Sequence, residues 1–126
     1  MVSSTLIGKR LISEGDRVLE EKAYTKAIDK YLEAIKAGYF GGGAESRLCW
    51  IADKLNNNNS EIEEKNFPDN ETIIDLGCEL VRNFPNNLGS NELADTGYLL
   101  LINFIPDEEI PRDVRMWMGH VSYQDA

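Results

Sequence analysis

Histidine is the side chain most often used for proton transfer at neutral pH, and this chain has one, His120. The nearest useful neighbour of His120 in the sequence is Arg115, within the segment Arg-Met-Trp-Met-Gly-His. Proton transfer or nucleophilic attack needs at least two groups within hydrogen-bond reach of each other. Arg115 and His120 are therefore the first pair to weigh as a catalytic site.

Other clusters of polar residues lack the spacing that a metal or phosphate site requires. The acidic run at 61–64 has neither the alternating Asp/Asn ligands nor the central glycine of an EF-hand loop. The run at 107–109 precedes a predicted helix, where acids meet the positive end of the helix dipole. The glycines at 41–43 are not followed by Lys and Ser/Thr, so they form no phosphate-binding loop. We interpret both acidic runs as solvated surface charge and expect no metal and no cofactor.

The two cysteines, Cys49 and Cys78, lie on separate predicted helices with no CxxC pair and no Cys/His cluster. This pattern predicts two reduced, buried thiols rather than a disulfide. Trp50 and Trp117 each suit either a helical core or an exposed interface, and the sequence leaves that choice open.

Composition favours one soluble domain over residues 1–126, with 42% apolar and 28% charged residues. No apolar run approaches the roughly 20 residues that cross a bilayer, and the N-terminus does not resemble a signal peptide, so we expect a cytoplasmic protein without membrane contact. The net charge of -9 opposes binding to nucleic acid. It also allows the hypothesis of an acidic inhibitor that occupies a basic site on its target.

The first third of the chain carries two amphipathic patterns in tandem. Apolar and small residues recur in steps of three and four, as one face of an α-helix requires; they are Leu11, Gly15, Val18 and Leu19, then Tyr24, Ala27, Ile28, Tyr31, Ala34 and Ile35. The pattern predicts a helical hairpin over 4–37, capped by Ser3 or Ser4, with a glycine-rich linker at 38–43. Gly15, Ala27 and Ala34 would let its two helices pack closely.

Further helices are expected over 44–121. They run over 44–55, from Asp69 as cap to 84, over 91–104, and from Pro111 to 121. The polar stretch 56–70 is predicted as a surface loop, in which Ser60 begins a capping-box pattern. The first of these helices would leave Arg47, Asp53 and Lys54 outside. Residues 98–102 are apolar all round, which places the helix 91–104 at the centre of the bundle; a strand there would have no partner. The fold class is all-α, a compact bundle of five or six helices.

The hairpin at 8–41 resembles a tetratricopeptide repeat, a helix–turn–helix unit. Leu11, Gly15, Val18, Tyr24, Ala27, Tyr31 and Ala34 occupy its signature positions in one ungapped register. The early Trp and the closing proline of the family are replaced by Leu11 and Tyr39. The remainder of the chain admits two registers for a degenerate second unit, so the number of repeats is open.

In that family, the first helix of each unit lines a groove that holds a peptide or a partner protein. The resemblance therefore implies partner-binding positions on the first helix, at Lys9, Ile12, Asp16, Leu19 and Glu20. The alternative for these five residues is a solvated helix face with Leu19 partly in the core.

The segment from Arg115 to His120 resembles the arginine, four residues, histidine motif of helical ribonucleases of the HEPN class. In that class the arginine steadies the cleaved phosphate and the histidine assists proton transfer. Met116 departs from the polar residue that commonly follows the arginine. We therefore expect a non-enzymatic protein-interaction module, adaptor or regulatory subunit that binds a protein or peptide. The HEPN-like ribonuclease is the alternative, and the oligomeric state is left open, a homo-oligomer included.

Overall fold

Five α-helices make up most of the described part of the chain. The computed structural model describes residues 3–39, 42–83 and 92–116, and these ranges contain no strand. The helices are α1 (Ser4–Glu20), α2 (Tyr24–Lys36), α3 (Ala44–Asn57), α4 (Asn70–Asn83) and α5 (Glu92–Phe104). Short 3-10 turns lie at Asn59–Glu61, Glu64–Asn66 and Asp107–Glu109, and residues 112–116 are again helical. The all-α prediction is confirmed.

The helix ends follow local side-chain chemistry. The Ser3 side chain accepts a hydrogen bond from the Leu6 amide (3.2 Å), and Asp69 accepts one from the Thr72 amide (2.8 Å), as helix N-caps do. Gly38, at φ +92°, ends α2 in the left-handed conformation that glycine adopts without strain. The predicted caps at Ser3 and Asp69 are therefore confirmed, whereas the 3-10 turn at Asn59–Glu61 has no side-chain cap, so the cap predicted at Ser60 is wrong.

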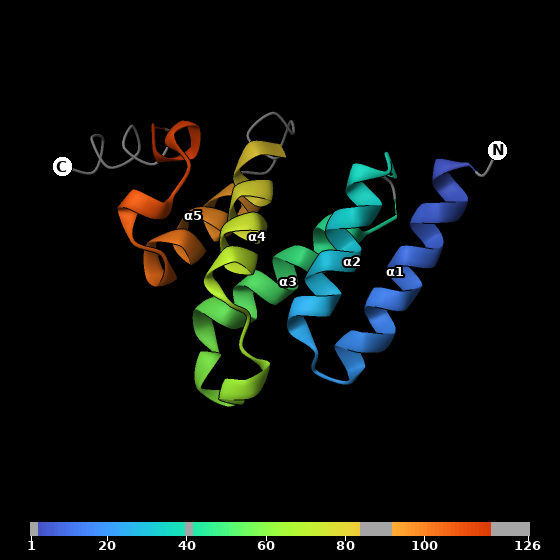
Figure 1. Cartoon of the computed structure of the whole chain (residues 1–126), viewed down its shortest axis with the longest axis horizontal. Coiled ribbons are helices and arrows are strands. Elements are labelled where there is room, and N and C mark those ends of the chain that lie inside the picture. The colour runs from blue at the N-terminus through green and yellow to red at the C-terminus, as the bar shows by residue number, and fades with distance from the viewer. Residues whose placement is uncertain (1–2, 40–41, 84–91, 117–126) are drawn as a thin grey trace.

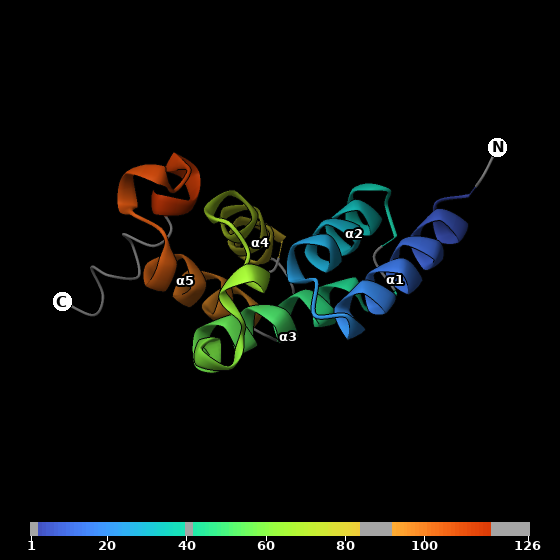
Figure 2. The same ribbon diagram turned by 60° about the horizontal axis from the view of Figure 1, so that its bottom comes forward.

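The helices form an elongated stack in two layers (Figures 1 and 2). α2 and α4 lie in one layer and α3 and α5 in the other, while α1 packs on α2 at the N-terminal end. α1 with α2, and α4 with α5, form the two most extensive pairings, and α3 contacts α2, α4 and α5. α3 thus joins an N-terminal hairpin to a C-terminal one.

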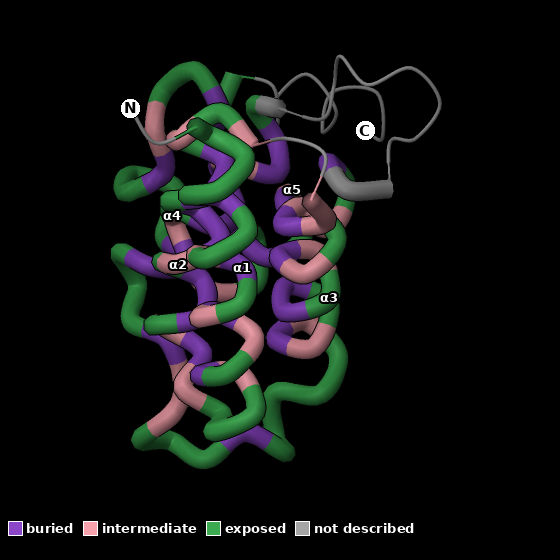
Figure 3. The backbone as a smooth tube through the Cα atoms, turned by 90° about the vertical axis from the view of Figure 1, so that its right-hand side faces the viewer, coloured by how far each residue is buried: buried purple, intermediate pink, exposed green. Residues whose placement is uncertain are grey.

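The hydrophobic core runs continuously between the two layers. Figure 3 shows the buried sides of α3 and α5 turned toward the other layer and their exposed sides turned outward. Fully buried side chains come from every helix after α1; among the largest are Ile28, Tyr31, Leu48, Ile51, Leu55, Leu76, Leu80, Leu100 and Leu101. One core therefore serves the whole stack.

Small residues set the separation of the helices within each hairpin. Ala27 and Ala34 are fully buried, and a Cβ atom on Gly15 would lie 2.6 Å from Cε1 of Tyr31. In the second hairpin, a Cβ on Gly97 would lie 2.9 Å from the carbonyl oxygen of Gly77. The prediction that Gly15, Ala27 and Ala34 face the hairpin interior is confirmed.

Two sequence predictions need correction here. α5 is not central: Leu100 and Leu101 are fully buried, but Leu99 and Ile102 are 45% and 63% exposed, because α5 lies at the C-terminal end of the stack. Apolar residues all round the helix therefore do not mean burial all round. The predicted loop 56–70 is also more structured than a surface loop, because α3 extends to Asn57 and the ring of Phe67 packs 5.5 Å from that of Phe104.

A methyl group at position 15 should destabilise the protein. The substitution Gly15→Ala improves helix propensity, but its Cβ would overlap the buried ring of Tyr31, and overpacking of this kind costs about 1 to 3 kcal/mol. Urea unfolding followed by circular dichroism measures the loss. Ser13→Ala, at an exposed position of the same helix, is the control and should leave the free energy of unfolding nearly unchanged. Equal stability of the two variants would contradict the close approach.

Candidate interaction surface

The five residues predicted to bind a partner lie along α1, and the structure separates them by accessibility. Lys9 and Glu20 are exposed. Ile12 is 6% exposed and belongs to the core, and Leu19 is partly buried against it. The Asp16 side chain is 45% exposed. The assignment of Ile12 to a binding face is corrected, because this residue lies on the side of α1 that packs inward.

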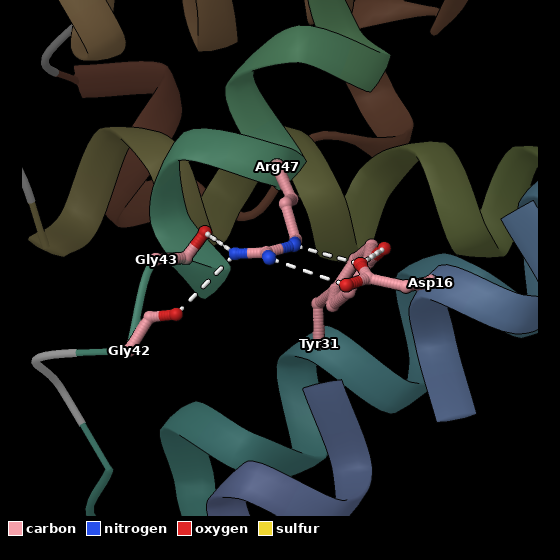
Figure 4. A network of polar contacts seen from close by, with 5 residues as sticks. All are labelled: Asp16, Tyr31, Gly42, Gly43 and Arg47. Carbon is pink, nitrogen blue, oxygen red and sulfur yellow. Dashed lines mark hydrogen bonds and ion pairs between the residues drawn. The ribbon is translucent and has the colours of Figure 1, made fainter. Parts of the chain in front are cut away.

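Asp16 is the centre of a polar network that joins three helices (Figure 4). Its carboxylate accepts a hydrogen bond from the Tyr31 hydroxyl of α2 (2.6 Å) and two from the Arg47 guanidinium of α3 (2.7 and 3.2 Å). Nη1 of Arg47 donates to the carbonyl oxygens of Gly42 and Gly43 at 3.3 and 3.1 Å. Such a two-point arginine–carboxylate contact fixes the orientation of both groups.

The network also controls the protonation of its members. Partial burial opposes the charged form of Asp16, but hydrogen bonds from Arg47 and Tyr31 outweigh burial and hold the pKa of Asp16 below its ordinary value. Burial, then the hydrogen bond to Asp16, raises the pKa of Tyr31. At neutral pH the network therefore contains a carboxylate, a guanidinium and a neutral phenol, which suits positioning rather than proton transfer.

Trp50 lies on the same side of α3 as Arg47, because it follows by three positions on a helix. The Trp50 residue is 54% exposed, and Nζ of Lys54 lies 5.5 Å from the centre of a Trp50 ring, within the range of a cation–π contact. Of the two core-or-interface alternatives for Trp50, the exposed position is the observed one. Trp117 lies outside the described residues.

These side chains define one surface, which we call the Trp50 face. On α1, Lys9, Asp16 and Glu20 are spaced at i, i+7 and i+11 and so share one side of the helix. The Asp16–Arg47 ion pair connects this side of α1 to α3. The Trp50 face consists of Lys9, Asp16 and Glu20 of α1 with Arg47, Trp50 and Lys54 of α3.

A surface hollow of about 200 Å³ adjoins the Trp50 face at Lys54. It opens between the turn joining α1 to α2, the second half of α3 and the 3-10 turns that follow α3; it is lined by Lys22, Tyr24, Lys54, Glu61, Ile62, Glu63 and Asn66. Charges of both signs surround it. Glu61 and Glu63, interpreted from sequence as solvated charge, thus line a recess.

A second hollow of about 140 Å³ lies between α2 and α4 and contains one of the two cysteines. Cys78 is 3% exposed, and burial raises the pKa of its thiol to about 11. This group is therefore a thiol at neutral pH and a poor nucleophile. Neither Cys49 nor Cys78 forms a disulfide, and Sγ of Cys49 lies 3.9 Å from the Thr96 hydroxyl. The sequence prediction of two reduced, buried thiols holds for Cys78, whereas Cys49 is only partly buried.

The Arg115–His120 pair cannot be assembled from the described residues. Arg115 is exposed on the helical segment 112–116, and His120 lies outside the described ranges, as does the predicted helix end at 121. The ribonuclease alternative therefore stays a prediction. Over residues 3–39, 42–83 and 92–116, no three His, Cys, Asp or Glu side chains gather as a metal site requires.

Comparison with known proteins assigns no family. No protein-family model, curated protein or solved structure matches this chain. In the part of the chain that the structure describes, no helix is both long and apolar enough to span a membrane.

Sequence reasoning did not assign Arg47, Trp50 or Lys54 to the binding surface, although it left an exposed interface open for Trp50. Arg47 and Lys54 were expected outside and are instead half-buried, Arg47 by its contacts with Asp16 and the linker. The available signal was their spacing at i, i+3 and i+7, which places a cation, an aromatic ring and a second cation on one side of a helix. The sequence could not show that Asp16 on α1 is the partner of Arg47.

The Asp16–Arg47 pair should couple energetically, and the coupling should vanish in acid. Because the folded-state pKa of Asp16 lies below its ordinary value of 3.8, its stabilisation is present above about pH 4 and is lost as the pH falls through the folded-state value. A double-mutant cycle with Asp16→Asn and Arg47→Met, measured by urea unfolding, should give about 1 kcal/mol or less at neutral pH, because both side chains are partly exposed.

The same cycle repeated at a pH well below the folded-state value provides the control. There Asp16 is protonated in both states, so the coupling should fall toward zero. A coupling energy that does not change with pH would show that the two side chains interact through packing and not through charge.

Proposed function

We propose that this protein is a non-enzymatic interaction module that binds a protein or peptide segment on the Trp50 face. The observation that carries the proposal is a large aromatic side chain, Trp50, left 54% exposed beside charged groups in fixed positions. Tryptophan and arginine are the residues most enriched among those that dominate binding energy at protein interfaces. A cytoplasmic adaptor or regulatory subunit would use such a surface.

Preorganisation supports this choice of surface. Arg47 is held by the Asp16 carboxylate and by two backbone carbonyl oxygens, and Lys54 lies over the Trp50 ring. Ordering a flexible side chain on binding costs about 0.5 to 1.5 kcal/mol, and part of that cost is already met in the free protein. A partner would therefore find the anchor residues close to their bound geometry.

The adjoining hollow indicates what kind of partner suits the face. Its volume of about 200 Å³ is smaller than the roughly 300 to 1,000 Å³ typical of small-molecule sites. It could hold one side chain of a partner that lies across Trp50. The mixed charges of Lys22, Lys54, Glu61 and Glu63 favour a polar side chain there.

The resemblance of residues 8–41 to a tetratricopeptide repeat supports the same function. In that family the first helix of a unit lines the binding groove, and here α1 contributes Lys9, Asp16 and Glu20 to the Trp50 face. The difference from the sequence expectation is that α3 supplies the aromatic anchor, so we place the binding site between α1 and α3.

Removal of the anchor should abolish partner capture. The immobilised protein and its Trp50→Ala variant are incubated with native extract, and retained proteins are quantified by mass spectrometry. Loss of a residue that dominates an interface weakens binding by roughly 30-fold or more, so at least one protein retained by the wild type should be lost. Lys9→Glu with Glu20→Lys should reduce capture of the same protein.

A charge-reversal control on the other layer separates specific from general effects. Lys26→Glu with Glu33→Lys changes two exposed residues of α2 and leaves the net charge unchanged, as the α1 pair does. This variant should retain the wild-type partner. Identical sets of retained proteins for the wild type, Trp50→Ala and the α1 variant would refute the assignment of the face.

A further inference from the structure

Large exposed apolar side chains are concentrated at the two ends of the stack. Within the described residues, one such side chain, Trp50, lies on α3, whereas the others lie on the first helix and on the last elements; they are Leu6, Ile7, Leu99, Ile102 and Met116. α1 and α5 lie at opposite ends of the long axis of the molecule (Figure 1). Isolated exposed apolar residues are common, but here five of the six lie on the first helix or on the last described elements.

On α5 the exposed apolar residues form a stripe with an acid. Asp95, Leu99 and Ile102 are spaced at i, i+4 and i+7 and so share one side of the helix. They are all exposed, and Ile102 is 63% exposed. The opposite side of α5 carries the buried Leu101 and the close approach to α4 at Gly97. We call Asp95, Leu99 and Ile102 the α5 stripe.

Within the molecule, helices of this layer are covered by the next helix of the stack. α3 is covered by α5 through contacts of Cys49 and Asn56 with Thr96, and of Asn56 with Asn103. Within the described residues, Leu99 and Ile102 of the α5 stripe have no such cover. End units of stacked-helix proteins normally carry a polar outer face, which keeps the ends from associating. The exposed side of α5 instead carries two large apolar residues.

The N-terminal end offers a surface of opposite charge. Leu6 and Ile7 are 62% and 40% exposed, and Lys9 and Arg10 follow with no acid between Ser4 and Ser13. The Arg10 side chain is 82% exposed, although its Nε lies 3.8 Å from a Glu14 carboxylate oxygen. We call Leu6, Ile7, Lys9 and Arg10 the α1 patch.

The C-terminal end has an acidic excess. The α5 stripe contributes Asp95, and the exposed acids at 107–109 follow α5 directly; Arg112 and Arg115 oppose them in part, while Asp113 is engaged with Arg82 at 2.8 Å. One end of the molecule thus carries an apolar pair with cations, and the other end carries an apolar pair with acids. Two surfaces of this kind, on two different molecules, are complementary in charge.

We propose that a second copy of this chain places its α1 patch on the α5 stripe, so that the stack continues from one molecule into the next. The contact joins two different surfaces, and such head-to-tail association produces open chains or closed rings rather than a two-fold dimer. The net charge of -9 opposes association at long range, but physiological salt screens charges beyond about 8 Å and leaves the local contacts. The α1 patch shares Lys9 with the Trp50 face, and the residues substituted in the test below belong to the α1 patch or the α5 stripe alone.

Two single-surface variants test the proposal by complementation. Leu6→Glu blocks the α1 patch and Ile102→Glu blocks the α5 stripe, and both positions are exposed enough to accept a charge without disturbing the core. Light scattering after size exclusion should show that the wild-type mass rises with protein concentration and that each variant alone stays monomeric. Mixing the variants should give a species of twice the mass of one chain, because each supplies the surface that the other lacks.

The controls keep each outcome decisive. Ser46→Glu adds the same charge at an exposed position of α3 and should associate as the wild type does. Ile7→Gln and Leu99→Gln remove apolar area without adding charge and should weaken association, and circular dichroism verifies folding of all variants.

A wild-type chain that stays monomeric overturns the proposal and leaves the stripe to a different protein. Mixed variants that stay monomeric, or variants that associate like the wild type, also overturn it. None of these results bears on Trp50.

Discussion

The contact of Tyr31 with Gly15 and Asp16 is the constraint on which the rest of the architecture depends. A glycine at position 15 lets the Tyr31 ring lie directly on α1, and the ring position brings the hydroxyl within 2.6 Å of the Asp16 carboxylate. The carboxylate in turn orients Arg47 of α3. The Tyr31 ring therefore fixes α1 against α2 by packing, and polar contacts of its hydroxyl group and of the Asp16 carboxylate then connect α3 to this pair.

The exposed surface follows from this arrangement. Arg47 is held by α1, and Trp50 lies on the same side of α3 as Arg47, where its exposed ring is close to the Lys54 ammonium group. The hydrophobic core is elsewhere, between the two layers, so a change at Trp50 itself need not disturb the core. Asp16 and Arg47 differ from Trp50 in this respect, because they link the helices and also belong to the Trp50 face.

Helix positions were predictable from the sequence, but their neighbours were not. Periodicity and caps located α1, α2 and α4 to within a residue or two, because the local pattern and the local hydrogen bonds agree, as at Asp69. The exposure of Ile102 could not be predicted, since an apolar residue reads the same whether its helix is central or terminal. Arg47 was predicted to be exposed to solvent, because its partner, Asp16, lies 31 positions away in the sequence. The partner-binding role of the α1 residues stays a prediction.

The position of α3 between the hairpins has a kinetic consequence. Each hairpin is made of helices adjacent in the sequence, and such local contacts form early because they close short loops. The contacts of α3 with α5 join residues separated by 47 positions, and so they come late. A growing chain would acquire its hairpins first and dock them on α3 last. The Trp50 face depends on the Asp16–Arg47 contact, which joins residues 31 positions apart, so a molecule in which α3 has not yet docked on the first hairpin would lack this face.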